Sequence, residues 1–142
     1  MKGKKKIMKK IKNKIFIRKI ILLVLSIVSL ILELLPYGVI FRTETPEGHL
    51  ERYTYSYFNL IPFQNGNVGP FLTAICTCLL CVLCITLLLL KKDTMQISKI
   101  AFVITFVASF IALIHDLTSF SILSGAICAL LGIGIIITFQ KS

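Results

Sequence analysis

Acidic side chains are scarce in this 142-residue chain, which has six Asp and Glu against sixteen Lys and Arg. An acidic disordered chain is therefore excluded. Eight glycines and four prolines are too few for a collagen-like fibre, in which every third residue is glycine. Hydrophobic residues make up 56% of the chain, above the roughly 45–50% of soluble domains. With a mean hydropathy of +0.90, this excludes a soluble enzyme.

Motifs of catalysis are also missing from the sequence. It contains no nucleophile–base set, phosphate-binding loop, dinucleotide fingerprint or zinc-protease motif. No soluble segment is large enough to hold such a site. We therefore predict a non-enzymatic protein with no catalytic residue, no metal and no cofactor.

Long uncharged runs fill most of the chain. A helix needs about 20 mainly apolar residues to cross a hydrocarbon core of about 30 Å, and four segments have this character. The sequence therefore predicts an all-α membrane protein, a four-transmembrane-helix bundle with a small external β-hairpin and aromatic loop. The predicted parts are a basic arm (1–19), a first span (20–41), an external loop (42–69), a second span (70–90), a cytoplasmic loop (91–99), a third span (100–115), an external turn (116–119), a fourth span (120–139) and a tail (140–142).

Basic residues are unevenly distributed between the loops. Ten lie within 1–19, three within 91–99 and one at Lys141, whereas the loop 42–69 holds only two, Arg42 and Arg52. Because Lys and Arg favour the cytoplasmic side of a membrane, we expect both termini in the cytoplasm and a plasma-membrane location. The Lys- and Ile-rich usage suggests a bacterial protein. The first apolar run is too long for a signal peptide and lacks a cleavage site, so we predict an uncleaved anchor.

The amino-terminal arm combines lysines with apolar residues. Met8, Ile11 and Ile15 recur at helical spacing and would form one apolar face. A basic amphipathic helix can lie on an anionic leaflet, and the alternative is an arm that only sets the topology. No aromatic or other nucleic-acid motif accompanies the charges, so no nucleic-acid partner is predicted. The predicted membrane-surface contacts are Lys4, Lys5, Lys6, Lys9 and Lys10.

The external loop has the pattern of a β-hairpin. Residues 45–48, Thr-Pro-Glu-Gly, predict a turn, and the alternation that follows predicts strands over about 39–45 and 49–57. Tyr53, Tyr55 and Tyr57 would share a face, which suits either the headgroup region or an external partner.

Three further residues of the loop leave two interpretations open. Glu47, His49 and Glu51 would share a face if all three lay in one strand. Two carboxylates and an imidazole can ligate a metal, but Glu47 falls in the predicted turn. A solvated charged tip is the alternative that we favour.

A short tract after the hairpin resembles a known family. Asn59-Leu60-Ile61-Pro62-Phe63 is similar to a tract in VanZ-like membrane proteins, which also have a basic amino terminus and several spans. Those proteins carry further acidic and arginine motifs near their later spans, where this chain has only Asp116. The resemblance therefore covers five residues and no site residue.

Polar residues inside the spans are the main candidates for function. Ser26, Ser29, Glu33 and Tyr37 follow helical spacing, so we expect them to face the interior of the bundle. A charged side chain within a membrane is costly and therefore suggests a function.

Two polar residues close the third span on the same side as Glu33. Glu33, His115 and Asp116 could lie at similar depth and relay protons or bind a cation. The alternatives are a hydrogen-bonded polar plug or an ion pair between Glu33 and Arg42. Small four-span multidrug transporters of bacteria also place a Glu in their first span and work as dimers, a similarity of architecture alone.

Cysteines and small residues form stripes on the later spans. Cys81 and Cys84 form a C-x-x-C pair, which in redox proteins is reactive, but no exposed partner thiol accompanies it. Small residues at helical spacing instead favour close helix packing in lipid. One stripe is Thr73, Thr77, Cys81 and Cys84, and a second is Ala101, Thr105, Ser109 and Ala112. The predicted packing residues of the fourth span are Ser121, Gly125, Ala129 (or the adjacent Cys128) and Gly132.

These patterns favour an accessory, immunity-type or complex-stabilising membrane protein. Its partners would be the lipid bilayer and a membrane protein or a second copy of the chain. The alternative is a small dimeric transporter or ion pathway that uses Glu33. A membrane thiol oxidoreductase that uses Cys81 and Cys84 is the third hypothesis.

Overall fold

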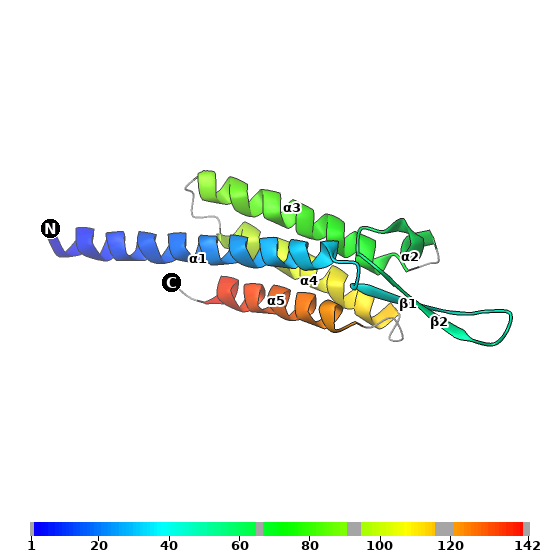
Figure 1. The fold of residues 1–142 in the computed structure, drawn as a ribbon. Coiled ribbons are helices and arrows are strands. Elements are labelled where there is room, and N and C mark those ends of the chain that lie inside the picture. Colours follow the sequence, from blue (N-terminus) through cyan, green and yellow to red (C-terminus); the bar gives the residue numbers. More distant parts are fainter. Residues whose placement is uncertain (1, 65–66, 91–94, 116–120, 141–142) are drawn as a thin grey trace.

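Four long apolar helices form the body of the protein. The computed structural model describes residues 2–64, 67–90, 95–115 and 121–140. The long helices are α1 (Lys2–Leu34), α3 (Gly69–Leu89), α4 (Met95–His115) and α5 (Ile122–Phe139). Helices α1 and α4 each pack against both α3 and α5, so the order around the bundle is α1, α3, α4, α5 (Figure 1). The predicted four-helix bundle is confirmed.

The outer surface of the bundle is apolar. Each of the four long helices is apolar enough over at least 18 residues to cross a membrane. Large side chains such as Leu79, Val82, Ile104 and Ile136 are more than half exposed on the outside. Such a surface is stable against acyl chains and not against water. The chain is therefore a multi-pass membrane protein in contact with lipid.

The basic arm and the first span form one continuous helix. Between Gly3 and Pro36 the sequence contains no glycine or proline, and Lys, Ile and Leu continue a helix readily. The 33 residues of α1 extend about 50 Å at 1.5 Å per residue, and its amino-terminal part projects beyond the bundle (Figure 1). The helix ends at Leu34 and not at residue 41, because Pro36 disfavours a helical conformation in the residue before it.

A β-hairpin projects from the end of the bundle opposite the termini (Figure 1). Strands β1 (Val39–Glu44) and β2 (Leu50–Tyr55) are antiparallel, with Val39 opposite Tyr55 and Glu44 opposite Leu50. Gly48 in the turn has a φ of 79°, which glycine adopts without strain. The predicted hairpin is confirmed. A short helix, α2 (Leu60–Gln64), then leads to α3.

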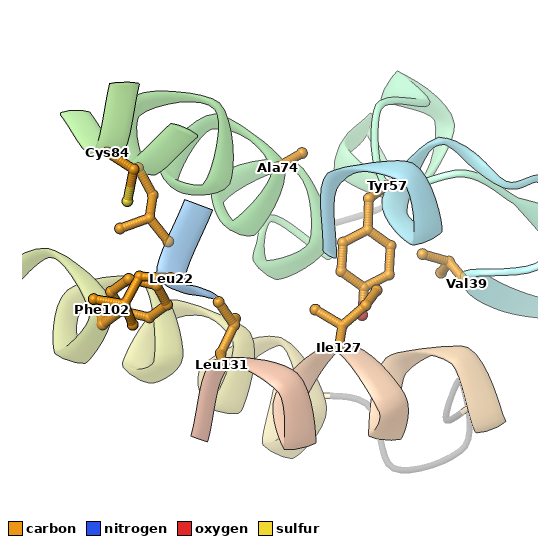
Figure 2. Close-up of a cluster of buried hydrophobic side chains, with 9 residues drawn as sticks. Leu22, Val39, Tyr57, Ala74, Cys84, Phe102, Ile127 and Leu131 are labelled. Carbon is orange, nitrogen blue, oxygen red and sulfur yellow. The ribbon is translucent and has the colours of Figure 1, made fainter. Parts of the chain in front are cut away.

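The core consists of buried side chains from all four long helices and from the hairpin region. Leu22, Phe102 and Leu131 meet on the side towards the termini, and Tyr57 lies beside Val39 and Ile127 on the side towards the hairpin (Figure 2). Figure 2 also shows Ala74 and Cys84 of α3. Ring and aliphatic side chains therefore fill the bundle along its length.

Two glycines allow close contact between helices. A Cβ on Gly69 of α3 would overlap the backbone of Ala112 on α4, and a Cβ on Gly134 of α5 would overlap the ring of Phe102. Close backbone approach is a principal source of helix association in lipid. At Gly132, by contrast, a Cβ would lie at an ordinary 3.5 Å from the Phe106 ring.

Replacement of Gly69 should therefore separate α3 from α4. We expect Gly69→Ala to destabilise the protein by about 1–3 kcal/mol, the usual cost of overpacking, whereas Gly132→Ala should leave the stability unchanged or raise it. The measurement is the midpoint of thermal unfolding in detergent, followed by far-ultraviolet circular dichroism. Equal midpoints for the two variants would contradict the contact between Gly69 and Ala112.

Candidate functional site

Glu33 lies in the last turn of α1 and is completely buried. Thr77 of α3 donates a hydrogen bond to its Oε1 atom over 2.7 Å. Thr77 lies eight residues after Gly69, about 12 Å along α3. If Gly69 marks the edge of the hydrocarbon core, Glu33 therefore lies inside the bundle about 12 Å into a core of about 30 Å.

The hydroxyl group of Thr77 has two acceptors within reach. Besides Glu33, the carbonyl oxygen of Thr73 lies 3.0 Å from its Oγ1 atom. A hydroxyl group has one proton to donate. If Glu33 is ionised, Thr77 donates to the carboxylate; if Glu33 carries a proton, it can donate to Thr77, which then donates to Thr73. The network thus has a hydrogen-bond pattern for either charge state.

Two buried oxygen atoms beside this network have no hydrogen-bond partner among the described residues. They are Oε2 of Glu33 and Oγ of Ser29, one turn apart on α1. An unsatisfied polar atom in the interior costs free energy, and most buried polar groups are satisfied. Protonation would remove the charge of the buried carboxylate, and a cation held by carboxylate and hydroxyl oxygen atoms would give both atoms a partner.

The region after the hairpin covers this site. The backbone N–H of Tyr57 donates to the carbonyl oxygen of Glu33 over 3.0 Å, and the Tyr57 side chain is 2% exposed. Burial raises the pKa of Tyr57 to about 12, so the ring is neutral at physiological pH. Ser121 and Ser124 of the α5 amino terminus both donate to the carbonyl oxygen of Gly38 over 2.8 Å, which ties α5 to the same region.

The other polar residues predicted beside Glu33 have varied positions. Asp116 and the side chain of His115 lie outside the described residues, so their proximity to Glu33 stays a prediction. Arg42 is exposed on β1 and Glu33 pairs with Thr77 instead. Tyr37 follows the end of α1 and is 63% exposed, so the prediction that it faces the interior is wrong.

Basic residues gather at the opposite end of the bundle. Arg18 donates to the carbonyl oxygen of Gln140 over 2.9 Å, and Lys19 donates to that of Leu87 over 3.2 Å. Each cation therefore meets the negative carboxyl end of a neighbouring helix. Lys99 lies 4.7 Å above the ring of Phe139 at the same end.

The predicted membrane-surface lysines all belong to α1. Lys9 and Lys10 are exposed, in the part of the helix that projects from the bundle. For Lys4, Lys5 and Lys6 only the helical backbone is described. Their contact with a leaflet stays a prediction.

The predicted packing residues of α5 differ in their surroundings. Ser121 is buried and serves as the N-cap, Gly125 and Gly132 are half-buried, and Ala129 is exposed. A Cβ on Gly134 of α5 would overlap the Phe102 ring of α4, a contact that the analysis of the sequence did not single out. The sequence offers one indication of this contact, which is that a second glycine follows Gly132 two positions later.

The stripes of α3 and α4 lie within the bundle. Thr73, Thr77, Cys81 and Cys84 are all buried, as are Thr105, Ser109 and Ala112. All five cysteines are free, and the burial of Cys81 and Cys84 closes them to thiol exchange.

Among the described residues, no group of three His, Cys, Asp or Glu side chains is arranged to hold a metal ion. Glu47, His49 and Glu51 at the hairpin tip are among the described residues, and they form no such group.

Comparison with known proteins does not add to this picture. No protein-family model, no curated protein and no solved structure matches the chain. The function must therefore be inferred from the site itself.

Two threonines of α3 allow the contact with Glu33 to be measured. Thr77 and Thr86 both donate to the carbonyl oxygen four residues earlier, but only Thr77 reaches Glu33. We expect Thr77→Val to destabilise the protein by about 0.6–1.7 kcal/mol, the range of interhelical hydrogen bonds in membranes, and Thr86→Val to be neutral. Unfolding in detergent–denaturant mixtures measures both. Equal losses would show that the bond to Glu33 adds nothing to stability.

Proposed function

We propose that this multi-pass membrane protein binds a proton or an alkali cation at Glu33 and carries it across the membrane. The observation that supports the proposal is the complete burial of Glu33 with one carboxylate oxygen atom unpartnered among the described residues. An ionisable residue within a membrane is a functional candidate by default, because it is costly to retain.

Polar side chains continue the site along the interface of α1 and α3. Ser26, Ser29 and Glu33 of α1, and Thr73 and Thr77 of α3, are all fully buried. From residue 26 to residue 33, α1 rises about 10 Å. A polar track of this length supports a bound ion inside the bundle, and it does not reach across a core of about 30 Å.

Buried side chains lie beyond both ends of this track. Tyr57 lies towards the hairpin, and Leu22 and Cys84 lie towards the termini (Figure 2). A site closed at both ends favours a carrier that opens to one side at a time over an open channel.

The accessory role that the sequence favours now has less support. It rested on the external loop and on small-residue stripes as surfaces for a partner, and the structure bears on the stripes alone. Apart from the half-buried Ala101, those of α3 and α4 are buried within the bundle, where they hold the chain's own helices together. They are therefore not free to contact another protein.

Removal of the Glu33 charge tests the proposal. Full-length protein in liposomes, with an imposed membrane potential, should carry protons, sodium or potassium, each followed with an ion-sensitive dye. Glu33→Gln keeps the size of the side chain and a hydrogen-bond acceptor for Thr77, so folding should persist while flux falls to that of empty liposomes. Glu47→Gln, which removes an exposed carboxylate from the hairpin turn, is the matched control and should retain full flux.

Two results would refute a carrier function. One is wild-type protein that carries none of the three ions faster than empty liposomes do. The other is a Glu33→Gln variant with unaltered flux.

We further propose a plasma-membrane location with both termini in the cytoplasm and the hairpin outside. Fourteen of the sixteen basic residues precede the first apolar run, lie between the second and third spans or follow the fourth. Both termini lie at one end of the bundle and the hairpin at the other (Figure 1). Retention of positive charge in the cytoplasm supports this orientation.

Reporter fusions test the orientation. Alkaline phosphatase inserted into the hairpin turn at Gly48 should be active, because it folds only outside the cytoplasm. A green fluorescent protein at the carboxyl terminus should fluoresce. The reverse pattern would invert the proposed topology.

A further inference from the structure

Two arginines face each other across the hairpin. The register places Arg42 of β1 directly opposite Arg52 of β2, so their side chains leave the same face with Cβ atoms about 5 Å apart. Like charges in this position are destabilising. Both side chains are exposed, and neither pairs with a carboxylate among the described residues.

The same face of the hairpin borders a cleft. Ile40, Arg52 and Thr54 form one wall, and the first residues of α5 form the other, around a volume of about 290 Å³. Glu44 shares the face but lies towards the hairpin tip, opposite Leu50, and does not line the cleft. The cleft therefore has a cationic rim and a largely apolar wall.

The amino terminus of α5 adds positive potential to the cleft. The N-cap Ser121 accepts a hydrogen bond from the N–H of Ser124, and its carbonyl accepts from Gly125. The N–H groups of Ile122 and Leu123, two residues that line the cleft, have no acceptor among the described residues. Unpaired N–H groups at the positive end of a helix bind anions, and here they belong to residues that line the same cleft as Arg52.

We propose that this cleft binds the phosphate group of an anionic phospholipid. Arginine pairs bind phosphate oxygen atoms with charge-assisted, often bidentate hydrogen bonds. A ligand phosphate would also relieve the repulsion between Arg42 and Arg52.

The apolar wall indicates a lipid and not a soluble phosphate. Ile122 is 90% exposed at the point where α5 enters the apolar layer, and Ile40 and Leu123 lie beside it. A phosphate held by Arg52 and the α5 amino terminus would place its acyl chains along these residues. The proposal is independent of ion binding at Glu33, because no residue is shared between the two sites.

Lipid binding to the purified full-length protein tests the proposal. Phosphatidylglycerol, phosphatidylcholine and inorganic phosphate are each titrated into protein in a neutral detergent. Bound lipids are counted by native mass spectrometry, and the midpoint of thermal unfolding is recorded. We expect wild-type protein to bind one phosphatidylglycerol in preference to phosphatidylcholine and to be stabilised by it.

Matched variants locate the lipid. The double variant Arg42→Gln and Arg52→Gln should bind phosphatidylglycerol about tenfold more weakly or worse, since it loses charge-assisted hydrogen bonds. Without lipid it should unfold at the wild-type temperature or higher, because the repulsion is gone. The double variant Lys12→Gln and Lys14→Gln removes the same charge from two exposed positions of α1 and should retain the bound lipid. Arg52→Lys, which keeps the charge and loses the planar fork, should show a partial loss.

Three results would overturn the proposal. The first is wild-type affinity in the double arginine variant. The second is equal binding of phosphatidylcholine and phosphatidylglycerol. The third is equal stabilisation by inorganic phosphate at the same concentration, which would assign the cleft to a soluble anion.

Discussion

The arrangement of the bundle depends on α1 being held at two levels between its neighbours. In lipid there is little hydrophobic force between helices, so polar bonds and close packing determine how they associate. Near the termini, Arg18 and Lys19 bind the last carbonyl groups of α5 and α3. Near the hairpin, the carbonyl oxygen of Gly38, just after α1, accepts two serine hydroxyl groups of α5. Together these bonds set both the depth and the rotation of α1, and the rotation turns Glu33 inward.

The hairpin and the buried carboxylate belong to one connected region. Tyr57, two residues after β2, donates its N–H to the carbonyl of Glu33 itself, and its ring packs near Ile127 (Figure 2). The chain therefore ends α1 directly after Glu33, forms the hairpin and returns to cover the same residue. A displacement of the hairpin relative to α5 would also disturb the cover of Glu33.

Much of the architecture could be predicted from local patterns, and most of the contacts of the site could not. Long apolar runs and the Thr-Pro-Glu-Gly turn are local signals, and they correctly indicated four spans and a hairpin. The partner of Glu33 is 44 residues away at Thr77, and nothing in the sequence relates the two. That pairing depends on the depth and rotation of two separate helices. Likewise, Gly69 beside Pro70 has the local appearance of a turn, whereas its contact with Ala112 exists only once α3 and α4 are packed.

Because α1 is one unbroken helix, its amino-terminal lysines lie well beyond the ends of the neighbouring helices, and this distance limits what their charges can act on. Arg18 marks the level at which α3 and α5 end, and Lys9 lies nine residues earlier, about 14 Å further out along the helix axis. The Debye length at physiological ionic strength is about 8 Å. If α1 stands along the membrane normal, the field of the outermost lysines is therefore strongly screened at the level of Arg18 and acts mainly on molecules in the adjoining aqueous layer. The predicted contact of these lysines with a leaflet would then need a tilt or a bend of α1.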